Sequence, residues 1–367
     1  MTDGQPARIN QPEENDVNGN RKIRVAVNGY GVIGKRVADA VARQDDMELA
    51  GVSDINADWR SRMVTQKGYR LFGAAKEQAD LMREAGLDVS GTLEDLLAAA
   101  DLVVDCTPKH VAAKNVEIYR QVGIKFIVQG GEKHTVTGHS FVAESSYVGA
   151  LDRESTRVVS CNTTSIVRTL SALKNAGLLR RARGTLLRRA TDPWESHLGG
   201  IMNTLVPEPE IPSHQGPDAK SVDSELDVVT MAVKVPQTLA HLHYWAVQLT
   251  RPAEKEEVLE AFRSSSRIAL IRMADGLTAI NTVKELMADL GRPHDNLYEV
   301  ALWSDMLKVE GDELFYGYMV DNQAIVIPET IDAIRALVGQ IRDPNESIAR
   351  TNTALGIGTI AKALGDQ

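Results

Sequence analysis

Cys161 is the residue whose surroundings best suit covalent chemistry. It lies in SCNTTSIVRTL, where a strand-like segment precedes it and a helix with apolar residues at Ile166, Leu170 and Leu173 follows. A cysteine at a helix N-terminus has its thiolate stabilised by the helix dipole and by unpaired backbone N–H groups. The same N–H groups can bind the oxyanion of a tetrahedral intermediate. We therefore expect Cys161 to be a nucleophile, whereas Cys106, in the apolar run LVVDC, fits a buried structural cysteine.

Histidines are the first candidates for the base that a thiol nucleophile needs. Among the eight histidines, His241 and His243 lie in TLAHLHYWAVQL, whose period-two pattern predicts a strand with both imidazoles on one face. One of them could reach the thiol while the other supports it. The alternative is a half-buried strand face on which both imidazoles are structural.

A third group of polar residues lies in the loop PSHQGPD, which contains Ser213, His214 and Asp218. Arg188 and Arg189, at the end of a β-like stretch, offer positive charge for a phosphate or a carboxylate. Taken alone, these residues also fit ordinary loop and surface charges.

A glycine motif near the start of the fold predicts dinucleotide binding. Gly29, Gly31 and Gly34 form G-x-G-x-x-G directly after a strand-like segment and at the start of a helical one. In this motif the glycines allow a tight turn, the approach of a pyrophosphate and close packing of helix on strand. The helix N-terminus then presents N–H groups to the phosphates. The alternative is a tight turn that binds nothing.

Asp54 is the candidate for recognising the ribose of that cofactor. It ends the second strand-like segment, twenty residues after Gly34. An acidic side chain there accepts hydrogen bonds from ribose hydroxyls and repels a 2′-phosphate, so we predict NAD in preference to NADP. The alternative is that Asp54 only caps the next helix.

Strand and helix patterns alternate through the first part of the chain. Apolar strand-like runs occupy residues 22–29, 49–54, 100–108 and 125–132. Segments with helical spacing lie at 34–44, 57–67, 76–86, 92–99 and 110–122. This alternation predicts right-handed βαβ units around a parallel sheet, that is, a Rossmann-like α/β domain.

The pattern changes near residue 156. Longer β-rich stretches follow at 183–191, 226–235 and 241–250, with a Pro-rich loop at 206–218, and helical segments return at 253–264, 281–290 and 329–341. These segments predict a second, α+β domain with a mixed or antiparallel sheet.

The composition narrows the class of protein. With 367 residues the chain is longer than one core usually holds, which favours two domains. A net charge of -9 gives no reason to expect nucleic-acid binding, and no apolar stretch is long enough to span a membrane. The polar residues 1–20 predict a disordered tail without the apolar stretch of a signal peptide. Two cysteines are too few for a disulfide framework and fit a reducing cytosol, so we expect a cytoplasmic protein. The sequence predicts no metal site.

Taken together, these segments resemble the archaeal-type (type II) phosphorylating glyceraldehyde-3-phosphate dehydrogenases. The similar segments are NGYGVIGKRVADAV, DLVVDCTP, IVQGGEK, SFVAESSY, SCNTTSIVRTL, LLRRATDP, PSHQGPD, TLAHLH and NQAIVIPET, in the family's order over residues 22–357. The resemblance implies a mostly tetrameric enzyme that uses NAD(P), a phosphorylated aldehyde and inorganic phosphate. It also implies an NAD(P)-binding domain over residues 21–159, a catalytic domain over 160–325 and a C-terminal helical segment, 326–367, that packs on the first domain.

The resemblance also implies roles for single residues. Cys161 would attack the aldehyde to form a thiohemiacetal, and His241 would be the general base, with His243 as the alternative. The implied substrate contacts are Ser160, Asn162, Arg188, His214 and Gln215. The implied cofactor contacts are Gly29, Gly31, Val32, Ile33, Gly34, Asp54, Gly131, Arg189 and Gln323.

Two positions depart from the family pattern. Gln215 stands where the family usually has a second histidine, which weakens the predicted phosphate contact. The segment SDINADW after the second strand replaces a Thr/Lys-rich sequence, so an acid stands where a lysine can pair with a 2′-phosphate. NADP is therefore expected to bind more weakly than NAD. The alternatives are a dehydrogenase of another sugar phosphate or semialdehyde, and a Rossmann-type redox sensor that has no turnover.

Overall fold

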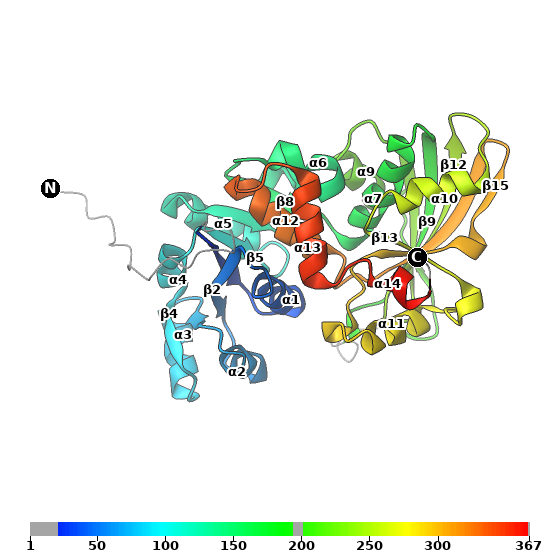
Figure 1. The fold of residues 1–367 in the computed structure, drawn as a ribbon. Helices are drawn as coiled ribbons and strands as arrows, with labels where there is room; N and C mark the ends of the chain where they lie inside the picture. The colour runs from blue at the N-terminus through cyan, green and yellow to red at the C-terminus, as the bar shows by residue number, and fades with distance from the viewer. Residues whose placement is uncertain (1–20, 194–200, 366–367) are drawn as a thin grey trace. The chain divides into compact units, whose positions relative to one another are not determined.

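The computed structural model describes residues 21–193 and 201–365, and the predicted tail, residues 1–20, lies outside them (Figure 1). Contacts within the chain divide it into two units. The first contains the described residues up to Phe141 together with Tyr147–Val158 and Ile327–Leu355. The second contains Val142–Ser146, Val159–Val326 and the described residues from Gly356 onwards.

The first unit is built on a sheet of eight strands, all paired in parallel, in the order β4-β3-β2-β1-β5-β6-β8-β7. The strands are β1 (Ile23–Asn28), β2 (Met47–Asp54), β3 (Leu71–Gly73), β4 (Val89–Thr92), β5 (Leu102–Asp105), β6 (Lys125–Val128), β7 (Ser140–Phe141) and β8 (Ser155–Val158). The helices are α1 (Val32–Val41), α2 (Trp59–Gln66), α3 (Lys76–Glu84), α4 (Leu93–Ala99), α5 (Ala112–Val122), α6 (Ala143–Ala150), α12 (Val326–Val338) and α13 (Pro344–Leu355). This confirms the predicted parallel α/β sheet. The strand order changes direction at β1, and open sheets of this kind bind ligands at the carboxyl ends of the strands beside such a switch point.

Apolar side chains on the strands and helices form the core of this unit. Val103 of β5 and Phe126 of β6 pack with Leu96 of α4, and with Val116 and Tyr119 of α5. All five side chains are almost fully buried. Strands covered on both faces need apolar residues in succession, which explains the unbroken apolar runs in the sequence.

A buried ion pair holds α12 within the first unit. The Arg335 guanidinium donates to both carboxylate oxygens of Asp46, over 2.7 and 2.9 Å, and both side chains are fully buried. Arg335 also donates to Gln44 and to Thr351 of α13. Removing one partner of such a pair leaves an uncompensated buried charge, so this contact constrains the packing of α12 against the segment before β2.

The second unit contains a mixed sheet in the order β10-β11-β9-β12-β16-β14-β13, with β15 paired to β16. Its strands are β9 (Leu179–Arg189), β10 (Val206–Pro207), β11 (Val228–Val235), β12 (His241–Leu249), β13 (Ile268–Ile271), β14 (Val300–Trp303), β15 (Lys308–Glu310) and β16 (Glu313–Val320). Its helices include α7 (Cys161–Asn175), α9 (Gln215–Lys220), α10 (Lys255–Arg263), α11 (Ile280–Asp289) and α14 (Thr359–Ala363). β9 pairs with β11, and β13 with β14, in parallel, and the other pairs are antiparallel. The predicted mixed sheet is confirmed.

The two faces of this sheet differ in burial. Along β12, the side chains of His241, His243 and Trp245 are buried, whereas that of Tyr244 is 43% exposed. The prediction that both imidazoles share one face is therefore confirmed. Helix α7 contacts β9 and β16, which places it against the buried face.

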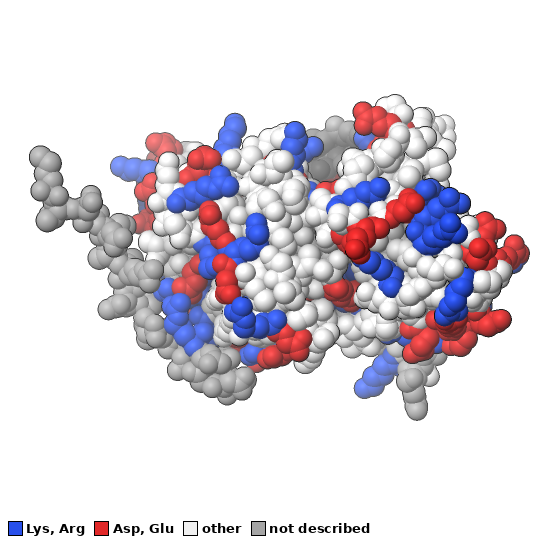
Figure 2. Space-filling model, turned by 90° about the horizontal axis from the view of Figure 1, so that it is seen from above, with Lys and Arg blue, Asp and Glu red and all other residues white. Residues whose placement is uncertain are grey.

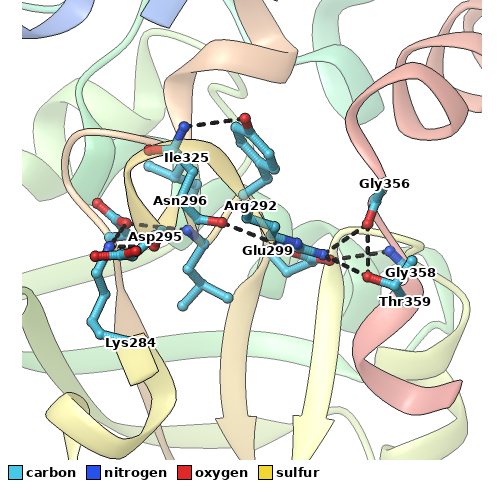
Figure 3. A network of polar contacts seen from close by, with 12 residues as sticks. Lys284, Arg292, Asp295, Asn296, Glu299, Ile325, Gly356, Gly358 and Thr359 are labelled. Atoms are coloured by element: carbon cyan, nitrogen blue, oxygen red, sulfur yellow. Dashed lines mark hydrogen bonds and ion pairs between the residues drawn. The ribbon is translucent and has the colours of Figure 1, made fainter. Parts of the chain in front are cut away.

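A buried ion pair also anchors the last described segment of the second unit (Figure 3). Arg292 donates to both carboxylate oxygens of Glu299, over 2.6 and 2.7 Å, and to the carbonyl oxygen of Gly356 over 2.9 Å. Arg292 also donates to the hydroxyl of Thr359, and Glu299 accepts the backbone N–H of Gly358. These contacts satisfy both carboxylate oxygens of Glu299 and both terminal nitrogens of Arg292, and they fix the start of α14. The Nε atom of Arg292 is buried without a partner among the described residues.

Charges of both signs are interspersed on the face of the molecule seen in Figure 2. Many of the described charges lie in local pairs, such as Arg263 with Glu260 on α10 at 3.3 Å. No helix within the described ranges is both long enough and apolar enough to cross a lipid bilayer.

The fold makes opposite predictions for two glycines of the glycine motif. A Cβ atom on Gly34 would lie 1.8 Å from the carbonyl oxygen of Gly29, whereas one on Gly31 would meet no atom within 4 Å. Gly34→Ala should therefore lower the free energy of unfolding by about 2 kcal/mol or more, because the backbone must shift. Gly31→Ala is the matched control and should unfold like the parent protein in a urea titration. Equal destabilisation of the two variants would contradict this packing.

Candidate active site

The glycine-rich turn leaves room for an anion at the start of α1. Gly29 has φ +94° and donates its N–H to Ser53 over 2.8 Å, and a Cβ on it would lie 3.1 Å from the backbone nitrogen of Thr107. Gly31 is the N-cap of α1, where no side chain accepts a hydrogen bond and no acidic residue lies in the first turn. Val32 and Ile33 are the first two residues of the helix. Their exposed helix terminus and the absence of a Cβ at Gly31 fit the pyrophosphate of a dinucleotide.

Asp54 lies at the end of β2 and connects this turn to the segment after the strand. One carboxylate oxygen accepts the backbone N–H of Tyr30 at 2.7 Å. The other accepts the backbone N–H groups of Ile55 and Asn56 and the side-chain amide of Asn56. Because the first oxygen receives only one of these bonds, it retains acceptor capacity for a ribose hydroxyl. The four donors also offset part of the carboxylate's charge.

The loops after β5 and β6 meet at the same edge of the sheet. Glu132 accepts the backbone N–H of His110 at 2.6 Å, and His110 has φ +70°, which is uncommon for a residue other than glycine. A Cβ on Gly131 would lie 3.5 Å from the side chain of Lys109. The structure thus places Gly131 at the carboxyl edge of the sheet in the first unit.

Cys161 is the first residue of α7, as predicted. Ser160 is the N-cap: its hydroxyl accepts the N–H of Thr163 and forms a 2.9 Å hydrogen bond with the Thr163 hydroxyl. The N-cap position therefore falls one residue before the cysteine. The Cys161 side chain therefore lies in the first turn of the helix.

The electrostatic environment of Cys161 contains opposing effects. Burial raises the pKa of the Cys161 thiol to about 11, while Arg189, the backbone N–H of Asn162 and Arg188 act to lower it. A pKa in this range favours the protonated thiol at neutral pH. The two arginines stabilise the thiolate once it forms.

Arg188 and Arg189 end β9 and carry unsatisfied hydrogen-bond donors. Arg188 pairs with Glu208, and Arg189 pairs with Asp192 at 2.9 Å. The Nε atom of Arg188 and the Nε and Nη1 atoms of Arg189 are nevertheless buried and have no hydrogen-bond partner within the described residues. Buried donors without partners are costly, and an anionic ligand would satisfy them.

The two histidines of β12 have different partners. His241 Nδ1 accepts the backbone N–H of Arg189 at 3.0 Å. His243 lies between the Asn162 Oδ1 atom, 2.9 Å from its Nε2, and the Tyr318 hydroxyl, 3.0 Å from its Nδ1. Both ring nitrogens of His243 thus have partners, and its ring fixes the side chain of the residue after the cysteine. Burial is the largest cause that lowers the pKa of both imidazoles, that of His243 to about 3.

The predicted loop around Ser213 also reaches the cysteine helix. Asp218 of α9 accepts the Thr163 hydroxyl of α7 at 2.7 Å, and Ser213 donates to the Thr230 hydroxyl. His214 is largely exposed, with its Nδ1 atom 3.6 Å from a Glu208 carboxylate oxygen. Gln215 is fully buried, yet neither its amide oxygen nor its amide nitrogen has a partner among the described residues.

Gln323 is connected to Arg189 through Asp192. Its side-chain amide donates to Asp192 at 2.6 Å, and Asp192 also pairs with Arg189. Asp192, Glu208 and Tyr318 were not among the predicted site residues. Asp192 lies in the segment LLRRATDP, and its proximity to the arginine pair was the only signal in the sequence.

Comparisons with known proteins agree with this geometry. The family model of the glyceraldehyde 3-phosphate dehydrogenase C-terminal domain matches residues 160–290, and that of the dihydrodipicolinate reductase N-terminus matches residues 23–134. The glyceraldehyde-3-phosphate dehydrogenase of Methanobrevibacter smithii is 45% identical over 335 residues, which cover 91% of this chain and 99% of that protein. That of Archaeoglobus fulgidus is 44% identical over 341 residues, covering 92% and 99%. The chain belongs to the glyceraldehyde-3-phosphate dehydrogenase family.

Family membership confirms the resemblance that the motifs indicated. The match to the glyceraldehyde 3-phosphate dehydrogenase C-terminal domain starts at Ser160, directly before the cysteine, and includes both arginines and both histidines of the site. The match to the reductase N-terminus covers the glycine motif and Asp54. The reductase match therefore lies within the first unit and the dehydrogenase match within the second.

The proximity of Arg189 to the cysteine predicts a change in thiol reactivity. Arg189→Met should raise the pKa of Cys161 further, because it removes a positive charge that lowers it. A higher pKa means less thiolate at any pH below it, so alkylation by iodoacetamide should slow by about threefold to tenfold. For the parent protein the rate should rise between about pH 7 and pH 9 without a plateau.

Arg183→Met is the matched control for this measurement. Arg183 lies on the same strand but pairs with Asp227 on the exposed side, and its removal should leave the alkylation rate unchanged. Equal rates for the parent and Arg189→Met across this pH range would contradict the assigned electrostatic role.

Proposed function

We propose that the protein is a phosphorylating glyceraldehyde-3-phosphate dehydrogenase. It would convert D-glyceraldehyde 3-phosphate and inorganic phosphate into 1,3-bisphosphoglycerate, with NAD(P)+ as the oxidant, in the cytoplasm. The observation that carries this proposal is Cys161 in the first turn of a helix, beside two arginines that have unpaired buried N–H groups. Relatives named glyceraldehyde-3-phosphate dehydrogenase align with this chain over 99% of their own length.

In the first step, the Cys161 thiolate adds to the aldehyde carbon. A carbon–sulfur bond forms and the aldehyde oxygen becomes an oxyanion. The thiol proton leaves to solvent, as the proton released in the oxidation, and Arg188 and Arg189 favour its departure because they stabilise the thiolate. The Ser160 hydroxyl accepts the N–H of Thr163, so the N–H groups of the first turn of α7 that precede Thr163 are the ones available to the oxyanion.

We propose that His241 stabilises this oxyanion. Its Nδ1 accepts the backbone N–H of Arg189, so the neutral ring carries its proton on Nε2. Burial, His243 and the two arginines lower the pKa of His241, which favours the neutral ring. We therefore assign to His241 Nε2–H a hydrogen bond to the developing oxyanion. The role of general base, suggested by the motif, would require Nδ1 to give up its bond to Arg189.

Oxidation and phosphorolysis then follow on the same sulfur. An oxidised nicotinamide, when bound, accepts the hydride from the former aldehyde carbon. The thiohemiacetal becomes a thioester, which conserves the energy of oxidation. An oxygen of inorganic phosphate then attacks the thioester carbon and the Cys161 thiolate leaves. Arg188, His214 and the unpaired amide of Gln215 are the proposed contacts of the anionic groups, with Ser160 and Asn162 around the carbonyl.

The glycine turn with Val32 and Ile33 would hold the pyrophosphate, and Asp54 would accept a ribose hydroxyl, which favours NAD over NADP. Gly131, Arg189 and Gln323 are proposed to line the nicotinamide side.

Replacing the nucleophile tests the proposed function. Cys161→Ser should lower turnover of glyceraldehyde 3-phosphate by about a thousandfold or more, because the alcohol is a far weaker nucleophile than the thiolate. Binding of NAD, measured by calorimetry, should persist. Cys106→Ser is the matched control and should keep its turnover. The rates should require phosphate or arsenate and should fall with other sugar phosphates or semialdehydes.

The outcomes of that experiment separate the alternatives. Full turnover by Cys161→Ser would exclude the covalent mechanism. Turnover that does not depend on phosphate would exclude phosphorolysis, and NAD binding with no turnover of any aldehyde would leave a redox sensor.

We also propose that the protein forms a homotetramer. On the face of the second sheet opposite His241 and His243, Met231, Tyr244 and Phe315 are exposed by 44%, 43% and 37%. Tyr244 on β12 and Phe315 on β16 lie on adjacent strands, and Thr185 of β9 separates Tyr244 from Met231 on β11. A second copy presenting the same face would bury these side chains, as isologous interfaces do.

A charge placed on this face tests the proposed assembly. Tyr244→Asp should lower the mass in solution from four times the 40.0 kDa of one chain to two chains or one, because the carboxylate would be buried unpaired. Tyr244→Phe is the matched control and should keep the full mass. Light scattering coupled to size exclusion measures both, and an unchanged mass for Tyr244→Asp would place the interface elsewhere.

A further inference from the structure

A row of three buried side chains leads from the second sheet to the residue that follows the nucleophile. Tyr318 of β16 and His243 of β12 are paired across the sheet, and their ring centroids lie 4.9 Å apart. The Tyr318 hydroxyl lies 3.0 Å from His243 Nδ1, and His243 Nε2 lies 2.9 Å from Asn162 Oδ1. Tyr318 and His243 are fully buried, and Asn162 is 4% exposed. Solvent therefore has almost no access to these hydrogen bonds.

The amide oxygen at one end of the row determines the direction of both hydrogen bonds. An amide oxygen only accepts, so His243 donates from Nε2 to Asn162. Burial, and after it the charge of Arg188, lower the pKa of His243 to about 3, so the ring is neutral at physiological pH and carries this one proton. Nδ1 is therefore an acceptor, and the Tyr318 hydroxyl donates to it. Tyr318 thus favours the tautomer of His243 that binds Asn162.

The amide nitrogen of Asn162 is the polar group that this arrangement leaves available. Among the described residues, none accepts a hydrogen bond from Asn162 Nδ2. Because the amide is planar, the bond that fixes Oδ1 also fixes the direction of the two N–H groups on Nδ2. The Ser165 hydroxyl donates to the Asn162 backbone carbonyl over 2.8 Å, so the backbone of this residue is held as well. Nearly buried donors without an acceptor are costly, and an oxyanion would satisfy them.

The same row of residues lies beside the imidazole that we assign to the oxyanion. The rings of His241 and His243 lie on one face of β12, with centroids 6.5 Å apart and planes inclined by 25°. Asn162 directly follows Cys161 in the first turn of α7. The residue that His243 orients is therefore the immediate neighbour of the nucleophile.

We propose that Asn162 Nδ2 donates a hydrogen bond to the oxyanion alongside His241, and that His243 and Tyr318 are positioning residues that orient this amide. The inference rests on the proposed function, because the oxyanion forms only when the thiolate adds to an aldehyde. The amide transfers no proton. It stabilises the charge that moves onto oxygen as the carbon–sulfur bond forms, and that charge returns to the carbonyl bond as the hydride leaves.

Steady-state kinetics with glyceraldehyde 3-phosphate, NAD and phosphate test this role. Asn162→Ala should lower kcat by about a hundredfold, the usual effect of removing one oxyanion donor. Tyr318→Phe should lower kcat by about tenfold, because His243 is then free to adopt the other tautomer. His243→Phe should lower kcat nearly as much as Asn162→Ala does. KM for the aldehyde should stay within about twofold, because the oxyanion is absent from the ground state.

A double variant separates positioning from a general structural role. Asn162→Ala combined with Tyr318→Phe should lose no more kcat than Asn162→Ala alone, because Tyr318 acts on the reaction only through this amide. Alkylation of Cys161 by iodoacetamide should stay within about twofold of the parent rate in Tyr318→Phe, since that reaction forms no oxyanion.

Tyr316→Phe is the matched control. Tyr316 is buried two residues away on the same strand, with its ring centroid 6.0 Å from that of Tyr318. Both ring nitrogens of His243 already have other partners, so loss of the Tyr316 hydroxyl should leave kcat within about twofold. Unfolding curves in urea check that every variant keeps the fold.

The failures of the two proposals can be told apart. A parent protein without turnover of the aldehyde would refute the proposed function and this inference with it. Turnover by the parent with an unchanged kcat in Tyr318→Phe would refute the inference alone. So would additive losses in the double variant, or a loss in Tyr316→Phe as large as that in Tyr318→Phe.

Discussion

The hydrogen-bonding register between β9 and β12 is the constraint on which the catalytic half of the protein depends. Leu242 pairs with Leu187 and His243 with Leu186, so His241 is brought beside the two arginines at the end of β9. A shift of one residue would turn both histidines to the opposite face of the sheet. The same register lets the backbone N–H of Arg189 meet His241 Nδ1. One strand pairing thus sets the position, the face and the protonated nitrogen of the imidazole.

Some polar groups of the site have all their hydrogen-bond partners, and others have buried atoms without a partner among the described residues. His243 has partners at both ring nitrogens and holds Asn162 in place, whereas Arg188, Arg189 and Gln215 bury polar atoms without partners. Each such atom reduces stability, by about 1–3 kcal/mol in typical cases. An anionic substrate would recover this free energy on binding. His243 is therefore held rigidly by its hydrogen bonds, while the arginines of the same site still have donors available for a ligand.

The sequence alone was sufficient where a local pattern determines the structure. The glycine turn, the Asp54 at the end of β2 and the Cys161 at the start of α7 are all encoded within a few neighbouring residues. The common face of His241 and His243 follows from period-two alternation. Contacts such as that of Tyr318 with His243, 75 residues apart in sequence, depend on the strand order and were out of reach.

The buried pair of Arg335 and Asp46 also bears on how the chain is made. The two residues are 289 positions apart, and the whole segment Val159–Val326 of the second unit is synthesised between them. While the protein is still on the ribosome, Asp46 has no arginine to neutralise it, and the surface that α12 covers remains open. The first unit, although it begins the sequence, is therefore completed only after the segment Val159–Val326 of the second has been synthesised. A chain that ends near residue 330 would contain every described strand of both sheets but would lack α13 and most of α12, and the apolar surface left open on the first unit is of the kind that chaperones bind.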